Sequence, residues 1–132
     1  MKSYLPALTG FVCAVLLCTN VHAQRDFSKV EIKTTQLAPN FYALDGDGGT
    51  IGVLAGADGV LMVDAQFAPL GERILTAIRK ISDGRIRFLV NTHLHGDHVG
   101  GNENIGKEGA VIMARDNLRA RLVKQGVSSG GA

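Results

Sequence analysis

The chain has 132 residues, of which 45% are hydrophobic and 20% are charged, with 14 lysine and arginine residues against 12 aspartate and glutamate residues. This length allows one small domain, and this balance of hydrophobic and charged residues excludes an intrinsically disordered chain. The net charge is only +2, and the basic residues do not form the clustered excess that phosphate-binding surfaces show. No nucleic-acid partner is therefore expected.

The first 23 residues have the features of a secretory signal. Lys2 precedes an apolar stretch from Leu5 to Cys18, and Val21-His22-Ala23 places small side chains where signal peptidase requires them. A membrane anchor is the alternative, but a helix over this stretch would span roughly 21 Å, less than the roughly 30 Å of a hydrocarbon core. We therefore expect a signal peptide over 1–23, a mature domain over 24–132, a periplasmic or secreted location and no stable membrane anchor after cleavage.

Short β-type runs separated by glycine-rich turns occupy the first part of the mature chain. Between the last two runs, the step Asp58-Gly59 predicts a hairpin, because glycine supplies the positive φ that such a connection requires. The pattern predicts an antiparallel meander with strands over 30–37, 41–44, 50–54 and 60–63.

The hydrophobic period changes after Pro69, and apolar residues then recur at helical spacing from Leu70 to Ile81. Pro69 favours a helix start and Gly84 a stop. Later elements are a buried strand over 86–90, a glycine-rich turn over 96–101, a strand over 110–113 and a helix from Asp116. This order predicts an α+β fold with a mixed, mainly antiparallel sheet and helices on one face.

Three of the four histidines of the chain fall within six residues, in the run His93-Leu94-His95-Gly96-Asp97-His98. At strand-like spacing His93, His95 and Asp97 project to one side, and a turn at Gly96 brings His98 round to them. Imidazole and carboxylate groups are ligands that zinc prefers. Ordinary polar residues on a surface loop are the alternative, but they do not explain the clustering. The sequence therefore predicts a metal site.

The histidine run resembles the signature of the metallo-β-lactamase-fold hydrolases, His-x-His-x-Asp-His after a buried strand, followed here by Val99-Gly100-Gly101. The upstream meander, the strand end at Val63-Asp64-Ala65 and the helix after it are also similar to the N-terminal half of that αββα sandwich. The resemblance implies that His93 and His95 bind a first metal ion, and that Asp97 and His98 bind a second. Zinc is the expected metal, with two ions in the complete protein; iron and manganese are alternatives.

The resemblance also implies ligands from a later half of the fold, namely a third histidine, a bridging aspartate and a final histidine. No histidine follows His98 in this sequence, and the one later aspartate, Asp116, stands where a helix cap is expected. We therefore expect this chain to be the N-terminal half of such a domain. A sheet without its second layer leaves an apolar face, so we also expect self-association.

The resemblance implies a metal-dependent hydrolase acting on a small molecule of the ester, thioester, lactone or β-lactam type, and the signal segment implies that it is secreted. Asp97 would orient a metal-activated water or take up its proton. Asp64, at a strand end, is a candidate to orient a ligand imidazole, with a loop-capping role as the alternative. A non-catalytic remnant with weak or no metal binding, and an iron-dependent oxidoreductase of the same fold, are the alternative functions.

The run from Asp45 to Gly49, Asp-Gly-Asp-Gly-Gly, superficially suggests a calcium loop. It lacks the later glutamate and the spacing of an EF-hand, so a turn is the better interpretation. The family resemblance places this turn beside the substrate.

The signal segment provides a first prediction. Expressed in a Gram-negative host, the protein should reach the periplasm with Gln24 as its new N-terminal residue, because cleavage is expected after Ala23. Mass spectrometry of the periplasmic fraction measures this directly. A periplasmic product that retains Met1 would contradict the prediction.

Overall fold

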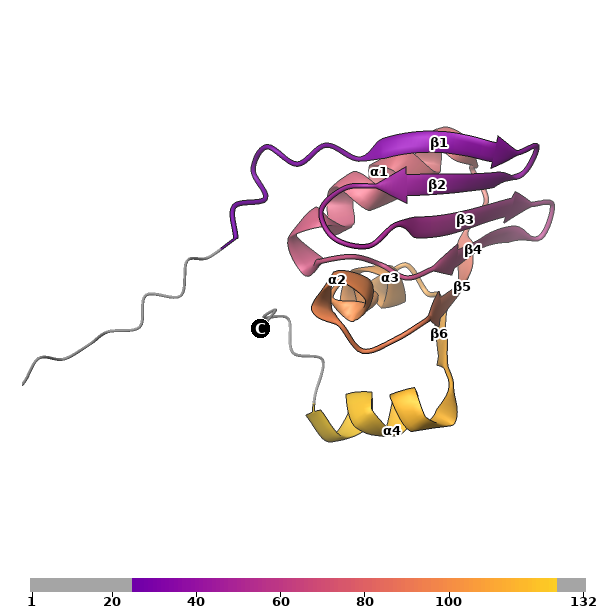
Figure 1. The fold of residues 1–132 in the computed structure, drawn as a ribbon. Coiled ribbons are helices and arrows are strands. Elements are labelled where there is room, and N and C mark those ends of the chain that lie inside the picture. The colour runs from indigo at the N-terminus through magenta and orange to yellow at the C-terminus, as the bar shows by residue number, and fades with distance from the viewer. Residues whose placement is uncertain (1–24, 126–132) are drawn as a thin grey trace, which may run out of the picture.

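A computed structural model describes residues 25–125, so the expected signal peptide over 1–23 lies outside the described residues. Six strands form one sheet in the order β1 to β6. The elements are β1 (Lys33–Ala38), β2 (Phe41–Asp45), β3 (Ile51–Gly56), β4 (Gly59–Val63), a 3-10 turn (Ala68–Leu70), α1 (Gly71–Ile81), β5 (Ile86–Asn91), α2 (Gly96–Val99), α3 (Asn102–Lys107), β6 (Val111–Ala114) and α4 (Asp116–Gln125) (Figure 1). None of the described helices is long and apolar enough to cross a membrane.

The sheet is mixed, as the sequence predicts. Strands β1 to β4 form an antiparallel meander, whereas β4, β5 and β6 run parallel to one another. The predicted hairpin joins β3 to β4: Gly56 pairs with Gly59, which has a φ of 115° and so lies in a region that favours glycine. Because β4 and β5 are parallel, their carboxyl ends meet at one edge of the sheet, and the histidine motif begins at that edge.

The hydrophobic core lies between one face of the sheet and the helices α1 and α3. Alternate residues of the central strands point into it, as the period of two along a strand requires. Its members include Ile51, Val53, Met62 and Leu89 from the strands, and Ile74, Ile78 and Ile105 from the helices. The predicted placement of helices on one face is thus confirmed for α1 and α3, while α4 contacts β6 and extends beyond that edge of the sheet (Figure 1).

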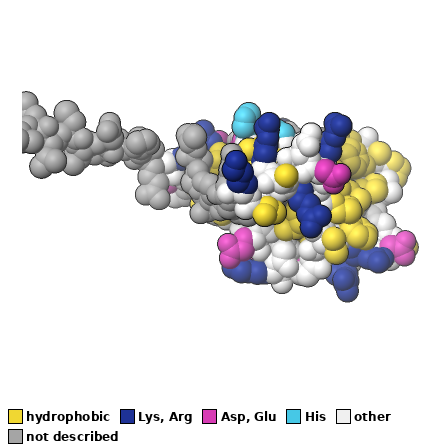
Figure 2. Space-filling view, turned by 90° about the horizontal axis from the view of Figure 1, so that it is seen from below, with side chains coloured by type: hydrophobic (Ala, Val, Ile, Leu, Met, Phe, Trp, Pro, Cys, Tyr) yellow, Lys and Arg dark blue, Asp and Glu magenta, His cyan; other side chains and the backbone are white. Residues whose placement is uncertain are grey.

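The opposite face of the sheet is also apolar, but it is only half buried. Leu61 of β4 lies between Leu54 and Phe88 in the register of the strands, and Phe88 lies beside Val111 of β6. Val111 is 56% exposed and Leu54 is 40% exposed. Viewed from the side of β6 and α4, hydrophobic side chains gather on one part of the surface, with lysine and arginine side chains around them (Figure 2).

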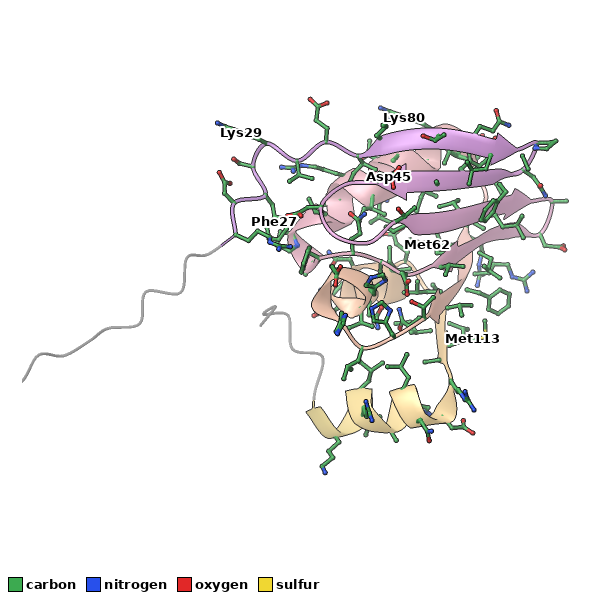
Figure 3. All side chains as sticks on the ribbon, viewed as in Figure 1. Phe27, Lys29, Asp45, Met62, Lys80 and Met113 are labelled. Atoms are coloured by element: carbon green, nitrogen blue, oxygen red, sulfur yellow. The ribbon has the colours of Figure 1, made fainter. Side chains whose placement is uncertain are left out.

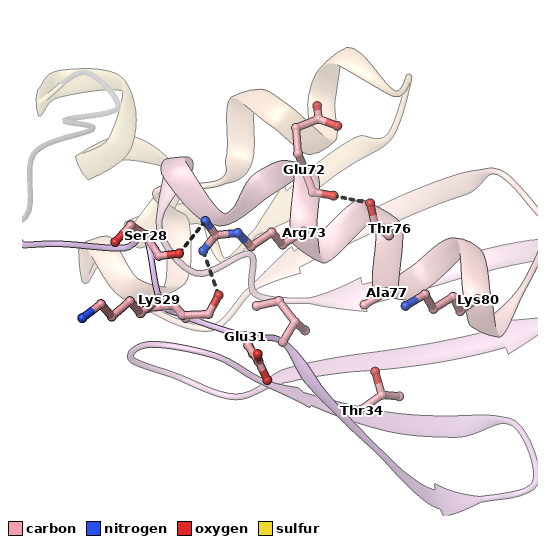
Figure 4. A pocket seen from close by; sticks show the side chains of 11 residues that line it. Ser28, Lys29, Glu31, Thr34, Glu72, Arg73, Thr76, Ala77 and Lys80 are labelled. Atoms are coloured by element: carbon pink, nitrogen blue, oxygen red, sulfur yellow. Dashed lines mark hydrogen bonds between the residues drawn. The ribbon is translucent and has the colours of Figure 1, made fainter.

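The segment before β1 differs from the prediction, because the strand begins at Lys33 rather than at residue 30. The Arg73 guanidinium of α1 donates hydrogen bonds to the carbonyl oxygens of Phe27, Ser28 and Val30, at 2.5, 3.3 and 2.7 Å. These bonds hold the segment against α1. An open groove of about 570 Å³ lies between the segment and α1, and charges of both signs line it, including Lys29, Glu31, Glu72 and Lys80 (Figure 4).

The two faces of β4 provide the second prediction. Leu61 and Met62 (the latter labelled in Figure 3) are neighbours in the chain. Met62 is fully buried in the core, whereas Leu61 lies on the half-exposed face. Met62→Thr should lower the free energy of unfolding by about 2–5 kcal/mol, because it leaves a cavity and buries a hydroxyl group. The matched variant Leu61→Thr should cost less than about 1.5 kcal/mol and should reduce self-association. Urea unfolding and sedimentation measure the two effects, and equal losses of stability would contradict this assignment of the faces.

Candidate metal centre

The histidine motif begins just beyond β5, and its second half is helical. The backbone amides of His98 and Val99 both donate to the carbonyl oxygen of His95, at 2.9 and 3.1 Å. These bonds close a helical turn, so Asp97 lies in the first turn of α2. The prediction that His93, His95 and Asp97 alternate as in a strand is therefore wrong. The predicted glycine-rich turn over 96–101 contains the short helix α2, and α3 follows it directly.

The three imidazole rings of the motif nevertheless lie together. The ring centroids of His93 and His98 are 3.9 Å apart, and those of His93 and His95 are 4.7 Å apart. Nε2 of His93 lies 3.1 Å from Nδ1 of His95. Two nitrogen ligands at about 2.0–2.1 Å from a tetrahedral zinc ion would be about 3.3 Å apart. The spacing of these two nitrogens therefore fits one edge of a zinc site.

His98 is held by a buried carboxylate. Its Nδ1 lies 2.7 Å from Oδ2 of Asp64, whose side chain is 5% exposed. Because an ionised carboxylate only accepts hydrogen bonds, this contact places a proton on Nδ1 and leaves the Nε2 lone pair of the neutral ring free for a metal ion. Histidine ligands of metal ions are commonly held in this way by a carboxylate.

Asp64 itself accepts two further hydrogen bonds, both from Thr92. The backbone amide of Thr92 donates to Oδ1 at 2.8 Å, and its hydroxyl donates to Oδ2 at 2.6 Å. The backbone of Asp64 has a φ of 65°, a left-handed conformation that is uncommon for a residue with a side chain. Its position immediately after β4, beside the end of β5, directs the carboxylate toward the start of the motif.

Asp64, His93 and His98 bring potential ligand atoms within 4.8 Å of one another, so the carboxylate is a possible ligand on distance alone. Its oxygens, however, already accept three hydrogen bonds, and the residue is 3% exposed. Coordination of a metal ion by Asp64 would require the bond to His98 to break. The geometry thus favours the orienting role that the sequence suggests for Asp64.

Asp97 lies on the open side of His98. Its Oδ2 is 3.5 Å from Nε2 of His98, the nitrogen that Asp64 leaves free, and its side chain is 30% exposed. A carboxylate in this position can share a cation with His98 and can also reach solvent.

Two glycines of the turn after β2 lie directly against the motif. A Cβ atom on Gly48 would overlap the side chain of Asp97, and one on Gly49 would overlap the ring of His98. The backbone of this turn therefore lies against both predicted second-site ligands, which agrees with a position beside a substrate. Within the turn, Asp45 accepts from the hydroxyl of Thr50 at 2.6 Å, and Asp47 pairs with Arg25 at 3.5 Å.

Two buried amide side chains frame the motif. Asn91, the last residue of β5, and Asn102, the first residue of α3, exchange two hydrogen bonds of 3.0 and 2.8 Å between their side chains. Both residues are almost fully buried, and buried amides that satisfy one another in this way fix the separation of the segments that carry them. The loop from Thr92 to Gly101 is therefore held at both ends.

Gln66 holds the turn that contains Gly48 and Gly49 through its side chain. It is fully buried, has a φ of 51°, and donates from Nε2 to the carbonyl oxygen of Gly49 at 2.5 Å. The sequence analysis did not identify Gln66, Thr92 or the asparagine pair. The one feature of the sequence that could have identified these residues is their position next to the strand ends that carry Asp64 and His93.

Residues 44–120, more than half of the chain, match the family model of the metallo-beta-lactamase superfamily. The chain belongs to this superfamily. A hydroxyacylglutathione hydrolase of Nitrosococcus oceani is 42% identical over 67 residues, which are 47% of this chain and 25% of that protein. A linear primary-alkylsulfatase of a Pseudomonas species is 36% identical over 76 residues, which are 52% of this chain and 14% of that protein. The chain thus spans a quarter or less of the length of these two relatives.

Solved structures of superfamily members share the fold. A metallo-beta-lactamase of Cronobacter sakazakii superimposes with a TM-score of 0.66 at 19% identity, over 73% of this chain and 38% of that chain. A subclass B3 metallo-beta-lactamase of Bradyrhizobium japonicum superimposes with a TM-score of 0.62 at 29% identity, over 70% of this chain and 36% of that chain. The α+β architecture expected from the resemblance is therefore confirmed, and the match covers little more than a third of each of these structures.

The contact between Gly49 and His98 provides the third prediction. Gly49→Ala should weaken zinc binding roughly tenfold or more, because the new methyl group would displace the His98 ring. Mutation of a group that supports a metal ligand typically costs about 10–100-fold in affinity. Gly56→Ala is the matched control, since the nearest atom to its Cβ would be the carbonyl oxygen of Gly59 at 3.9 Å. Isothermal titration calorimetry with zinc compares the two variants. Equal affinities would show that the turn does not support the metal centre.

Proposed function

We propose that the protein is a secreted, metal-dependent hydrolase that acts on a small-molecule substrate. The observation that supports this most directly is the spacing of 3.1 Å between Nε2 of His93 and Nδ1 of His95. Beside them lies the ring of His98, whose Nδ1 is hydrogen-bonded to the buried carboxylate of Asp64. Membership of the metallo-beta-lactamase superfamily and the names of the two relatives, a hydrolase and a sulfatase, support the same reaction class.

The residues that would hold metal ions are those of the motif. His93 and His95 are proposed for a first ion, and Asp97 with His98 for a second. Zinc suits this donor set of imidazole and carboxylate, while iron and manganese accept the same ligands. When bound, such an ion supplies a water of pKa near 7 and stabilises negative charge that develops on the substrate.

Asp97 is the proposed catalytic residue. Its carboxylate lies beside the free nitrogen of His98 and is partly exposed, so it can reach both a metal ion and a solvent molecule. In this position it would orient the attacking water and take up its proton. This chemistry requires no serine or cysteine nucleophile. Both cysteines of the chain lie in the expected signal segment.

The substrate class stays broad in this proposal. The names of the two relatives specify an acylated glutathione in one case and an alkyl sulfate in the other. What such reactions have in common is water attacking an electrophilic centre. We therefore propose an ester, thioester, lactone or β-lactam type of substrate, met in the periplasm or outside the cell.

The fourth prediction tests this function in protein expressed from the complete reading frame. A chelator should abolish hydrolysis of a panel of ester, thioester, lactone and β-lactam substrates, and added zinc should restore it. Asp97→Ala should lower kcat by about 10²–10⁴-fold, the range that general-base residues contribute. Asp83→Ala is the control, because Asp83 is exposed on the loop after α1 and should leave kcat unchanged.

Two results would overturn the proposal. Hydrolysis that survives both chelation and Asp97→Ala would exclude metal-dependent catalysis at this centre. Oxidation of substrate with bound iron, without any hydrolysis, would assign the centre to the oxidoreductase alternative.

A further inference from the structure

Thr92 lies between the buried carboxylate and the first histidine of the motif. Its hydroxyl oxygen is 2.6 Å from Oδ2 of Asp64 and 3.0 Å from Nδ1 of His93. The same carboxylate oxygen is 2.7 Å from Nδ1 of His98. Asp64 is therefore linked to two histidines, directly to His98 and through Thr92 to His93.

The protons of this network can be placed by counting donors and acceptors. The Asp64 carboxylate only accepts, and a hydroxyl group has one proton to donate. At 2.6 Å from Oδ2, the Thr92 hydroxyl donates its proton to Asp64. Toward His93 the oxygen can then only accept, so the proton of that contact belongs to Nδ1 of His93.

We propose that Thr92 is a positioning residue that holds His93 as its Nδ1–H tautomer, with the Nε2 lone pair directed at the metal position. The inference rests on the metal centre proposed above, for which Nε2 of His93 and Nδ1 of His95, 3.1 Å apart, are the proposed ligand atoms. A neutral imidazole free in water favours the opposite tautomer, with the proton on Nε2. The hydroxyl of Thr92 thus reverses the intrinsic preference of the ring.

His95 would bind through the other type of ring nitrogen, since its Nδ1 is the atom that lies 3.1 Å from Nε2 of His93. The bonds to Thr92 and Asp64 therefore concern the tautomers of His93 and His98, which zinc binding should leave unchanged.

The fifth prediction uses nitrogen NMR of the histidine rings in the full chain, at a pH where the rings are neutral, without and with zinc. Wild-type His93 and His98 should show Nδ1–H in both states. Thr92→Val removes the hydroxyl and retains the β-branched shape, so His93 should change to the Nε2–H tautomer and zinc affinity should fall roughly 10–100-fold. Thr92→Ser should restore both properties.

Thr76→Val is the matched control, because the Thr76 hydroxyl bonds to the carbonyl oxygen of Glu72 on α1, away from the motif. A wild-type His93 that carries its proton on Nε2 overturns the proposal, whether or not Thr92→Val folds. So does a Thr92→Val variant with the tautomer and zinc affinity of Thr76→Val. These measurements involve no substrate, so a protein that binds zinc but hydrolyses nothing would still give the expected results. The proposed hydrolase function and the positioning role of Thr92 can therefore fail separately.

Discussion

The carboxylate of Asp64 makes the contacts on which the geometry of the candidate metal centre depends. It is buried at the end of β4 and accepts hydrogen bonds from the backbone and hydroxyl of Thr92 and from the ring of His98. A buried carboxylate is costly unless its acceptors are used, and here three donors from the neighbouring segment use them. Loss of one donor would leave the charge poorly compensated, so the carboxylate restricts the histidines to a narrow range of positions.

The fold brings the parts of this network together from distant points in the chain. Thr92 follows Asp64 by 28 residues and His98 follows it by 34, yet the parallel pairing of β4 with β5 places them side by side. The segment from Ala65 to Gln66 then lies against the end of the motif. The backbone amide of Ala65 donates to the carbonyl oxygen of His98, and the backbone amide of Gly101 donates to the carbonyl oxygen of Gln66, both at 2.8 Å. Glycine is required at residue 101 because a Cβ atom there would overlap the carbonyl oxygen of Ala65.

Much of this arrangement could be predicted from the sequence, because it depends on local patterns. Alternation and turn residues located all six strands to within a few residues, and the spacing of the histidines identified the motif. The helical turn at His95 was missed, because a strand-like alternation and a short helix both fit six residues that contain one glycine. The roles of Thr92, Gly49 and the Asn91–Asn102 pair were also missed, since each depends on a partner that only the folded chain brings near.

The central claim is that histidines bind the metal ion while Asp64 holds one of them in place. Anomalous diffraction at the zinc absorption edge, on crystals of the zinc-loaded protein, tests it most directly. The account predicts zinc within about 2.0–2.1 Å of Nε2 of His93 and Nδ1 of His95, with the contact between Asp64 and Nδ1 of His98 intact. A zinc ion coordinated by a carboxylate oxygen of Asp64, with His98 released from that contact, would contradict it.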